Sequence, residues 1–424
     1  MDKRTFLKNA GFGLAGSLLT SNNLKSIVNS VKNIHPDRLA GYEEFWQEVR
    51  GGYRLKPDYI NLENGYYCFC PQFTLEAFIE HIREINYQGS YYMRTRQFDQ
   101  KREITARLSD VLGCSEDELI ITRNTTESLD TIISGIDWKK GDEAVMAEQD
   151  YGAMLNQFKL MSERYGMINK LISVPNHPAS DEEIVELYRS AITPKTRILM
   201  VCHMINITGQ ILPVRKICDM AHSYGVEVLV DGAHAFAHIK YSVKDLDCDY
   251  YGASLHKWLS APLGSGILYV KKERVGSKWP IFAHWQAGRD DVFKFNHTGT
   301  HPVYNDIAIL DAIQYYNIIG PERKEARLRY LRNYWYNKVQ NTNGIILNTP
   351  KDENRSCGIA NVGINALPPS ELAAILMDEY RIYTVAIDGA GVHGCRITPN
   401  IYTSPAELDR FTDALMEINK RYNK

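Results

Sequence analysis

The sequence predicts an α/β protein with a mostly parallel, seven-stranded sheet, helices on both faces of it, and a smaller C-terminal α+β domain. Apolar runs of strand length alternate with helical patterns from about residue 118 to residue 272. The regular alternation of strand and helix patterns ends near residue 285, and short strand-like segments and charged helical patterns follow. The length of 424 residues, 44% of them hydrophobic, is enough for one large core and a second domain.

Seven apolar segments are the expected strands, and helical patterns lie between them. The strands are expected at 118–122, 143–148, 168–174, 197–203, 226–232, 249–254 and 266–272. The intervening helices are expected at 126–135, 151–165, 181–191 and 213–224. Beyond residue 285, we expect a long charged helix near 321–340 and a closing helix that begins at Pro405.

This pattern divides the chain into three parts. Residues 1–35 are expected to be an export signal and linker, residues 36–284 mainly the large ligand-binding domain, and residues 285–424 the small domain. We expect the N-terminal segment, near residues 40–60, to contribute to the small domain as well.

The N-terminus "MDKRTFLK" has a charged head followed by an apolar segment, Ala10–Leu19, that is too short to span a bilayer. It resembles a twin-arginine export signal in which Lys3 replaces the first arginine. This resemblance implies a periplasmic or exported protein, recognised by an export machinery and without a stable membrane span. The alternative is an amphipathic N-terminal helix of a cytoplasmic protein.

Charge and cysteine content exclude several classes of partner. The net charge is −2, with 49 basic and 51 acidic residues mixed along the chain, which argues against nucleic-acid binding. The eight cysteines form no CxxC pair and no cysteine–histidine cluster with zinc spacing, so no metal site is expected. A small-molecule ligand is the expected partner.

Polar residues that follow the strands are the candidate site, because ligands of open α/β sheets bind at the carboxyl ends of the strands. In "ITRNTTES", Asn124 would cap a helix whose first residues are Thr125 and Thr126. Free N–H groups and two hydroxyls at this helix N-terminus suit a phosphate. The alternative is a plain capping box completed by Glu127.

Two further strands end in polar residues. Asp231 ends the apolar run "VEVLVD", with His234 three residues later, and a cationic ring nitrogen of a ligand would suit its carboxylate. His203 and Asn206 follow the strand "RILMVC". Each of these side chains could instead be a core polar group satisfied by neighbouring backbone.

Lys257 lies in "SLHKWLS", at the end of another strand, where a solvated surface lysine is not expected. It is either half of an ion pair or a lysine whose pKa falls on burial, so that it can form a Schiff base with an aldehyde. A phosphate seat at Thr125 and Thr126, a carboxylate at Asp231 for a ring nitrogen and this amine together suit one cofactor, pyridoxal 5′-phosphate.

Four motifs, "NTTES", "HMINITG", "VDGAHAFAH" and "SLHKWLSAPLGSGILYV", resemble those of the class V aminotransferase family. The resemblance covers roughly residues 58–420. This family belongs to the fold-type I pyridoxal-phosphate enzymes and contains cysteine desulfurases, kynureninases and isopenicillin N epimerase. The fold implied is therefore the fold type I of pyridoxal-phosphate-dependent transferases.

The resemblance implies a role for each matching residue at the phosphate. Thr125 and Thr126 would hold the phosphate, with help from Ser254 and His256. The segment "HTGTH" resembles the loop through which one subunit sends a threonine, here Thr300, to the phosphate of the other subunit. A homodimer with shared active sites is therefore expected.

At the ring, Lys257 would form the Schiff base, and Asp231 would hold the pyridine nitrogen. Asn206 and His234 would approach the ring hydroxyl. Tyr151, in "EQDYGAML", falls where family members place a side chain that stacks on the cofactor, although a surface or core tyrosine is the alternative.

Arg396, in "CRITPNIY", matches the family arginine that binds the substrate carboxylate, with a buried structural ion pair as the alternative. The expected substrate is an amino acid or an amino-acid-containing peptide.

The sequence favours the isopenicillin N epimerase branch, with an epimerase or aminotransferase activity. A cysteine desulfurase needs a mobile cysteine, and Cys395 next to Arg396 is expected to be buried. A desulfurase or C–S lyase that performs β-elimination is the alternative. A non-catalytic binding protein is disfavoured, because Lys257 and Asp231 are both present.

Overall fold

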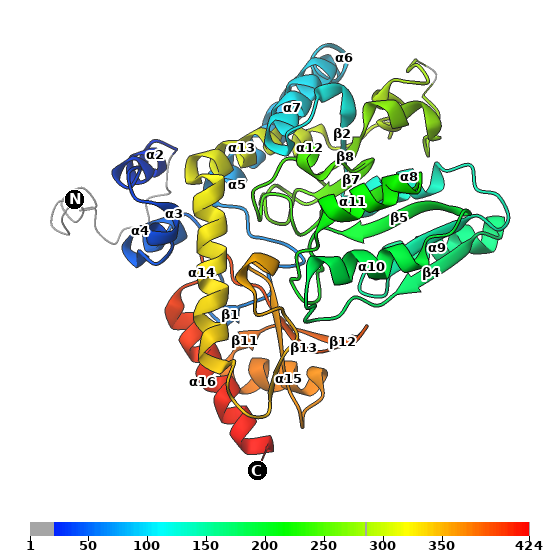
Figure 1. Cartoon of the computed structure of the whole chain (residues 1–424). Helices are drawn as coiled ribbons and strands as arrows, with labels where there is room; N and C mark the ends of the chain where they lie inside the picture. Colours follow the sequence, from blue (N-terminus) through cyan, green and yellow to red (C-terminus); the bar gives the residue numbers. More distant parts are fainter. Residues whose placement is uncertain (1–20, 285, 424) are drawn as a thin grey trace.

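A computed structural model describes residues 21–423 except residue 285, and its centre is a seven-stranded sheet with the strand order β2-β8-β7-β6-β5-β3-β4 (Figure 1). The expected strands are all present, within one or two residues at most ends. They are β2 (Leu119–Thr122), β3 (Glu143–Ala147), β4 (Ile168–Ile172), β5 (Thr196–Cys202), β6 (Glu227–Asp231), β7 (Tyr250–Ser254) and β8 (Gly266–Val270).

The sheet is mostly parallel, as predicted. Strands β4, β3, β5, β6 and β7 pair in parallel. Strand β8 is antiparallel to both of its neighbours, β2 and β7, so β2 and β7 run in the same direction. The carboxyl ends of β2, β7, β6, β5 and β3 therefore lie at one edge of the sheet.

Helices cover both faces of this sheet, because its central strands bury side chains on both sides. In β5, Ile198 and Met200 join one hydrophobic cluster, whereas Leu199 and Val201 join another. Edge strand β4 is only partly buried. Helices α8 (Thr125–Ser134) and α9 (Gly152–Tyr165) pack on the first cluster, and α7 (Gln97–Leu112), α10 (Asp181–Ala191), α11 (Val214–Ser223) and α12 (Val243–Leu246) pack on the second.

The remaining helices of the first 320 residues surround this core. They are α2 (Ser21–Ser30), α3 (Pro36–Ala40), α4 (Glu43–Arg50), α5 (Gln72–Gln88), α6 (Ser90–Thr95) and α13 (Val303–Ile319). Helix α13 packs against α5 and α7 and contributes to the core of the large sheet. In Figure 1, α2 to α4 lie to one side, next to the long helix α14 (Pro321–Val339).

The C-terminal part is a four-stranded antiparallel sheet, β12-β13-β10-β9, with its own hydrophobic core. Strand β1 pairs in parallel with β11 beside it, and so ties the N-terminal segment to this part. Its elements are β1 (Ile60–Asn61), β9 (Ile345–Leu347), β10 (Ala360–Ile364), β11 (Ile382–Tyr383), β12 (Val385–Gly389), β13 (Val392–Ile397), α15 (Pro369–Tyr380) and α16 (Pro405–Tyr422).

The domain boundary expected at residues 284 and 285 stays a prediction, although α13 packs with the large sheet and the C-terminal core begins in α14. Of the expected export signal and linker, residues 1–35, residues 1–20 lie outside the described part of the chain. Among the described residues, no helix combines the length and apolar character that crossing a bilayer requires.

Candidate active site

Two of the predicted phosphate residues, Thr125 and Ser254, meet at the N-terminus of α8. The side chain of Asn124 caps this helix by accepting a hydrogen bond from the N–H of Glu127 at 2.9 Å. The Ser254 hydroxyl, at the end of β7, accepts a hydrogen bond from the Thr125 N–H at 2.9 Å and lies 2.7 Å from the Thr125 hydroxyl. Because first-turn N–H groups have no intrahelical acceptor, the N–H of Thr126 is free for a ligand.

This arrangement is not a complete capping box. The Glu127 carboxylate accepts a hydrogen bond from the N–H of Arg123 at 2.6 Å, one residue before the cap, and it also pairs with the Arg123 guanidinium. The capping alternative is therefore partly present, but it uses neither Thr125 nor Ser254. The hydroxyls of these two residues remain at the helix N-terminus, where an anion is favoured.

Asp231 is buried at the end of β6, as the apolar run before it predicts. Its Oδ1 accepts a hydrogen bond from the Ala233 N–H at 2.9 Å, and Oδ2 accepts none from the described residues. Burial raises the pKa of the carboxyl, while the nearby charge of Lys257 opposes that rise. A cationic group of a ligand would relieve the cost of this buried charge.

Lys257 lies beside Asp231 and His234. Its Nζ is 3.3 Å from Nε2 of His234. Burial is the main cause that lowers its pKa from 10.5 to about 8, with Asp231 opposing the change and Arg396 adding to it. Among the described residues, Lys257 forms no hydrogen-bonded ion pair, and near pH 8 about half of it is the uncharged amine.

His256 and Asn206 also lie at this edge of the sheet. His256 is buried, its Nδ1 has no hydrogen-bond partner among the described residues, and burial lowers its pKa to about 4. The carbonyl oxygen of Asn206 accepts a hydrogen bond from Arg396 at 3.2 Å. His203 instead packs edge-on against Tyr241, with ring centroids 4.6 Å apart, as a core side chain.

Arg396 pairs with a residue that the sequence did not reveal as part of the site. Its Nε and Nη2 donate to the two carboxylate oxygens of Glu63 at 3.1 and 2.6 Å, and both side chains are buried. The ion pair foreseen as an alternative therefore exists. Because Nη1 also donates one N–H to the Asn206 carbonyl, one N–H remains on each terminal nitrogen for a substrate carboxylate.

The backbone fits closely around this pair. A Cβ on Gly65 would lie 2.7 Å from Cζ of Arg396, so only glycine allows the guanidinium to occupy this position. The acidic residue in "INLENG" was not assigned to the site from the sequence, and no strand was predicted there. Only the fold shows that its partner is 333 residues away.

Within the described part of the chain, two predicted residues make no hydrogen bond or ring contact with the other predicted site residues. Tyr151 is the N-cap residue of α9 and is 46% exposed. Thr300 is exposed, and with His297 and His301 it lines a cavity of about 840 Å³ next to α6 and α7. The stacking role of Tyr151 and the phosphate role of Thr300 stay predictions.

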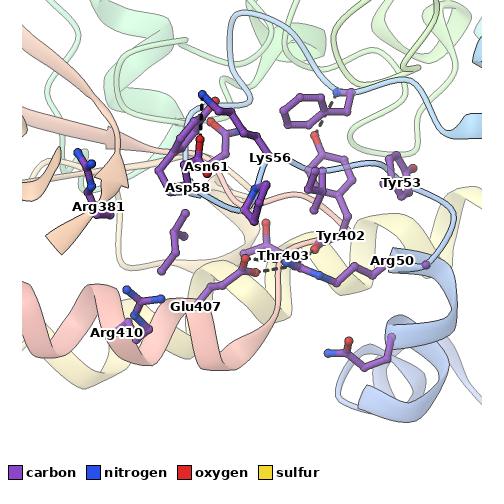
Figure 2. A pocket seen from close by; sticks show the side chains of 17 residues that line it. Arg50, Tyr53, Lys56, Asp58, Asn61, Arg381, Tyr402, Thr403, Glu407 and Arg410 are labelled. Carbon is purple, nitrogen blue, oxygen red and sulfur yellow. Dashed lines mark hydrogen bonds and ion pairs between the residues drawn. The ribbon is translucent and has the colours of Figure 1, made fainter. Parts of the chain in front are cut away.

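A further cavity, of about 590 Å³, lies between the N-terminal segment and α16, and Figure 2 shows Arg50, Lys56, Arg381 and Arg410 around it. The hydroxyl of Tyr402, which also lines it, donates to the Asn64 side chain at 2.7 Å. The predicted cofactor residues do not line this cavity. Tyr402 connects its wall to the segment that carries Glu63.

The described residues fit pyridoxal 5′-phosphate. Thr125, Thr126 and Ser254 would hold its phosphate, and the free oxygen of Asp231 would hold its ring nitrogen. The buried amine of Lys257 can carry its aldehyde carbon. No group of three or more potential metal-ligating side chains occurs in the described part of the chain.

Relatives with named activities are similar to most of the chain. The chain is 27% identical to isopenicillin N epimerase of Streptomyces clavuligerus over 87% of this chain and 97% of that protein. It is 25% identical to a cysteine desulfurase of Haloferax volcanii over 84% and 88% of the two chains.

Among solved structures, the apo cysteine desulfurase of Thermococcus onnurineus matches with a TM-score of 0.77 and 21% identity over 88% of this chain and 98% of that one. The cystine C–S lyase C-DES, in complex with cysteine persulfide, matches with a TM-score of 0.76 and 20% identity over 84% and 97%. These likenesses confirm the predicted fold.

The aminotransferase class-V family profile matches residues 71–411, which is most of the chain. Together with the strand-end carboxylate, the buried lysine and the phosphate seat, this match shows that the chain belongs to the class-V aminotransferase family and that pyridoxal 5′-phosphate is its cofactor.

Proposed function

We propose that this protein acts at Cα of an amino acid, or of an amino-acid-containing peptide, as an epimerase or aminotransferase that uses Lys257. The observation that carries the proposal is the Lys257 amine, with a pKa lowered to about 8 by burial, between the Asp231 carboxylate and the His234 ring. An amine in this state is both a nucleophile and a proton carrier.

The bound cofactor supplies an aldehyde for amines and a protonated ring that withdraws electrons from Cα. Asp231 holds the positive charge at the ring nitrogen. Nζ of Lys257 exchanges the proton on one face of Cα, and an epimerase also needs proton exchange on the opposite face. Arg396 uses the N–H groups that Glu63 leaves free to bind the substrate carboxylate, which orients Cα toward Lys257.

The cysteines argue against a desulfurase that forms a persulfide on a mobile thiol. Cys395 is buried, its Sγ donates to the Pro369 carbonyl at 3.6 Å, and burial raises its pKa to about 12. The other seven thiols are also buried or partly buried, and burial raises the pKa of each. A thiol in this state is a poor nucleophile at neutral pH.

A C–S lyase that performs β-elimination is the second candidate, because that reaction requires a leaving group on the substrate and no nucleophilic cysteine. The resemblance to a cystine C–S lyase supports it. The match to isopenicillin N epimerase, 27% identical over 97% of that protein, supports the first candidate.

Incubation of the holoenzyme with L-amino acids and short peptides in D₂O separates the candidates. An epimerase gives deuterium at Cα with inversion and no oxo acid. An aminotransferase gives an oxo acid and leaves the cofactor as its amine form, and a β-eliminating lyase releases an oxo acid together with ammonia and the leaving group. Mass spectrometry and chiral chromatography measure all of these products.

Lys257→Ala is the control, and it should lose the reaction and the visible absorbance band of the lysine-bound cofactor. Asn317→Ala, at an exposed position of α13, should change neither. If the protein binds the cofactor but no substrate exchanges its Cα proton, the proposal fails in favour of a non-catalytic binding protein.

We also propose that the enzyme is a homodimer that shares its sites through Thr300, and that residues 1–35 direct it to an export machinery. Exposed aromatic side chains on α5 to α7, among them Tyr87 and Phe98, support the dimer. Cell fractionation of the wild type and of a variant with Arg4→Gln tests export: the variant should stay in the cytoplasm, and equal distribution of both would contradict the proposal.

A further inference from the structure

Two buried rings next to Lys257 have no role in the function proposed above. Trp258 follows Lys257 directly and is fully buried, and its indole Nε1 donates a hydrogen bond to Nδ1 of His234 at 3.4 Å. His238 packs against the indole, with ring centroids 3.7 Å apart. Both rings therefore determine the surroundings of the His234 side chain that faces Lys257.

The indole determines which nitrogen of His234 carries the proton. An indole N–H can only donate, so Nδ1 of His234 must be the unprotonated nitrogen. Burial lowers the pKa of His234 well below its ordinary value, and Lys257, Arg396 and His238 lower it further, so the ring is neutral. A neutral imidazole with a bare Nδ1 has its proton on Nε2, the atom that lies 3.3 Å from Nζ of Lys257.

This proton placement constrains the lysine. A protonated lysine has only donors, so it cannot accept a hydrogen bond from Nε2–H of His234. The uncharged amine has a lone pair and can accept it. The hydrogen bond from Trp258 to His234 is therefore compatible with the contact between His234 and Lys257 only when Lys257 is uncharged.

Trp258 is itself held from two sides. Nζ of Lys324, on α14, donates to the Trp258 carbonyl. The N–H of Gly358 donates to Nε2 of His238 at 2.8 Å, so His238 carries its proton on Nδ1 and donates it to the His234 carbonyl at 2.9 Å. This second ring thus fixes both the plane of the indole and the backbone of His234.

We propose that Trp258 is a positioning residue that fixes the proton of His234 on Nε2 and thereby favours the uncharged, nucleophilic form of the Lys257 amine. The inference rests on Lys257 being the reactive amine of the proposed function. It adds a residue that touches neither cofactor nor substrate and acts through His234.

Other groups also face Lys257, and they are the same in the variants used below. Asp231 on β6 raises the pKa of Lys257, and Arg396 on β13 lowers it. Cys68, after β1, and Cys202, at the end of β5, raise it. A change caused by loss of the indole N–H is therefore measured against a constant set of neighbouring charges.

The first test is the protonation of His234 in the protein without cofactor. Nitrogen NMR of protein labelled with ¹⁵N-histidine, with the His234 signals assigned from a His234→Asn variant, should show the proton on Nε2 alone. In Trp258→Phe, which keeps an aromatic ring and removes the N–H, the signals should show a mixture of both tautomers. A proton on Nδ1 in the wild type overturns the proposal, whether or not the variant folds.

The second test is the pKa of Lys257 itself. Competitive acetylation across a pH series, read by peptide mass spectrometry, gives the reactivity of the Lys257 amine without cofactor or activity. We expect its pKa to rise by about half to one pH unit in Trp258→Phe, the equivalent of one net hydrogen bond. An unchanged pKa in a folded variant overturns the proposal.

Trp46→Phe is the matched control. Trp46 is equally buried, and its indole N–H donates to the Leu39 carbonyl at 2.8 Å, away from the site. This variant should lose comparable stability and leave both the His234 tautomer and the Lys257 pKa unchanged. If Lys257 proves not to be the reactive amine, these two measurements remain valid, so failure of the proposed function is distinguishable from failure of this inference.

Discussion

The state of the Lys257 amine results from opposing effects at one atom. Removal from water favours the uncharged form, while the Asp231 carboxylate favours the charged form, and removal from water is the larger effect. The amine is therefore half protonated near pH 8, where an ordinary lysine is almost fully charged.

This balance predicts the pH dependence of cofactor uptake. Because only the uncharged amine attacks an aldehyde, the rate at which the apo-protein develops the visible absorbance band should rise with pH and level off above about pH 8. Stopped-flow absorbance measures this rate. A rise that continues to pH 10 would show that Lys257 has an ordinary lysine pKa and would contradict the prediction.

The Glu63–Arg396 pair makes a second prediction at the scale of single residues. Glu63→Gln leaves a buried guanidinium without its counter-charge, which should lower the free energy of unfolding by about 3 kcal/mol. Denaturant unfolding of the apo-protein measures the loss. An added carboxylate that binds Arg396 should recover part of it.

Glu379→Gln is the control for that measurement. Glu379 also pairs with an arginine, Arg421, through both carboxylate oxygens, but that pair is exposed. Exposed pairs are worth about 1 kcal/mol or less, so this variant should be nearly as stable as the wild type. Equal losses of unfolding free energy in the two variants would show that burial does not increase the contribution of the Glu63–Arg396 pair to stability.

The residues that could be predicted from the sequence are those that lie next to apolar strands, such as Asp231 and Lys257. A polar residue at the end of an apolar run can be recognised from the sequence alone. Glu63 and Trp258 could not be assigned in this way, because their roles depend on partners, Arg396 and His234, that only the folded chain brings within hydrogen-bonding distance.

At the scale of elements, the start of α8 combines a helix cap with the predicted phosphate site. Asn124→Ala should lower the free energy of unfolding by about 1 kcal/mol, because the N–H of Glu127 loses its acceptor. It should also weaken cofactor binding, because the first turn that presents Thr125 and Thr126 then frays. Unfolding curves and a cofactor titration measure the two effects.

Ser180→Ala tests whether the weaker cofactor binding expected for Asn124→Ala comes from the first turn of α8. Ser180 caps α10 through the N–H of Glu183 at 3.2 Å and lies at an exposed surface. The loss of this cap should cost a similar free energy without any change in cofactor affinity. A comparable loss of affinity in both variants would mean that general destabilisation, and not the first turn of α8, is responsible.

Helices and strands with strong periodicity were predicted to within about two residues at most ends, as for α8 to α11 and the seven strands. The reversed direction of β8 could not be derived, since strand direction depends on the connection and not on the strand sequence. The helices α5 to α7 were also not predicted. Many of their positions are exposed, so apolar residues do not recur at the regular helical spacing that identifies a helix in a sequence.

At the scale of the whole molecule, the exposed aromatic side chains and the position of Thr300 lead to a prediction about subunits. A mixture of Lys257→Ala and Thr300→Ala chains, each inactive alone, should regain about a quarter of wild-type activity after unfolding and refolding together. Half of the random dimers are hybrids, and one of the two sites in a hybrid contains both residues.

Activity of the mixture is read after sedimentation has confirmed dimers. A mixture of Lys257→Ala with Asp231→Ala is the control, because both residues belong to the same chain's site and no hybrid restores it. Failure of the first mixture, with dimers present, would show that Thr300 does not serve the neighbouring subunit.

The distance along the chain between Glu63 and Arg396 also has a consequence for biosynthesis. The strand ends that carry Thr125, Asp231 and Lys257 leave the ribosome well before strand β13 does, so the seat for the cofactor can form on a nascent polypeptide. Glu63, made earlier still, has no counter-ion until translation is nearly finished. Newly made protein therefore completes the Glu63–Arg396 pair last, when residue 396 has emerged.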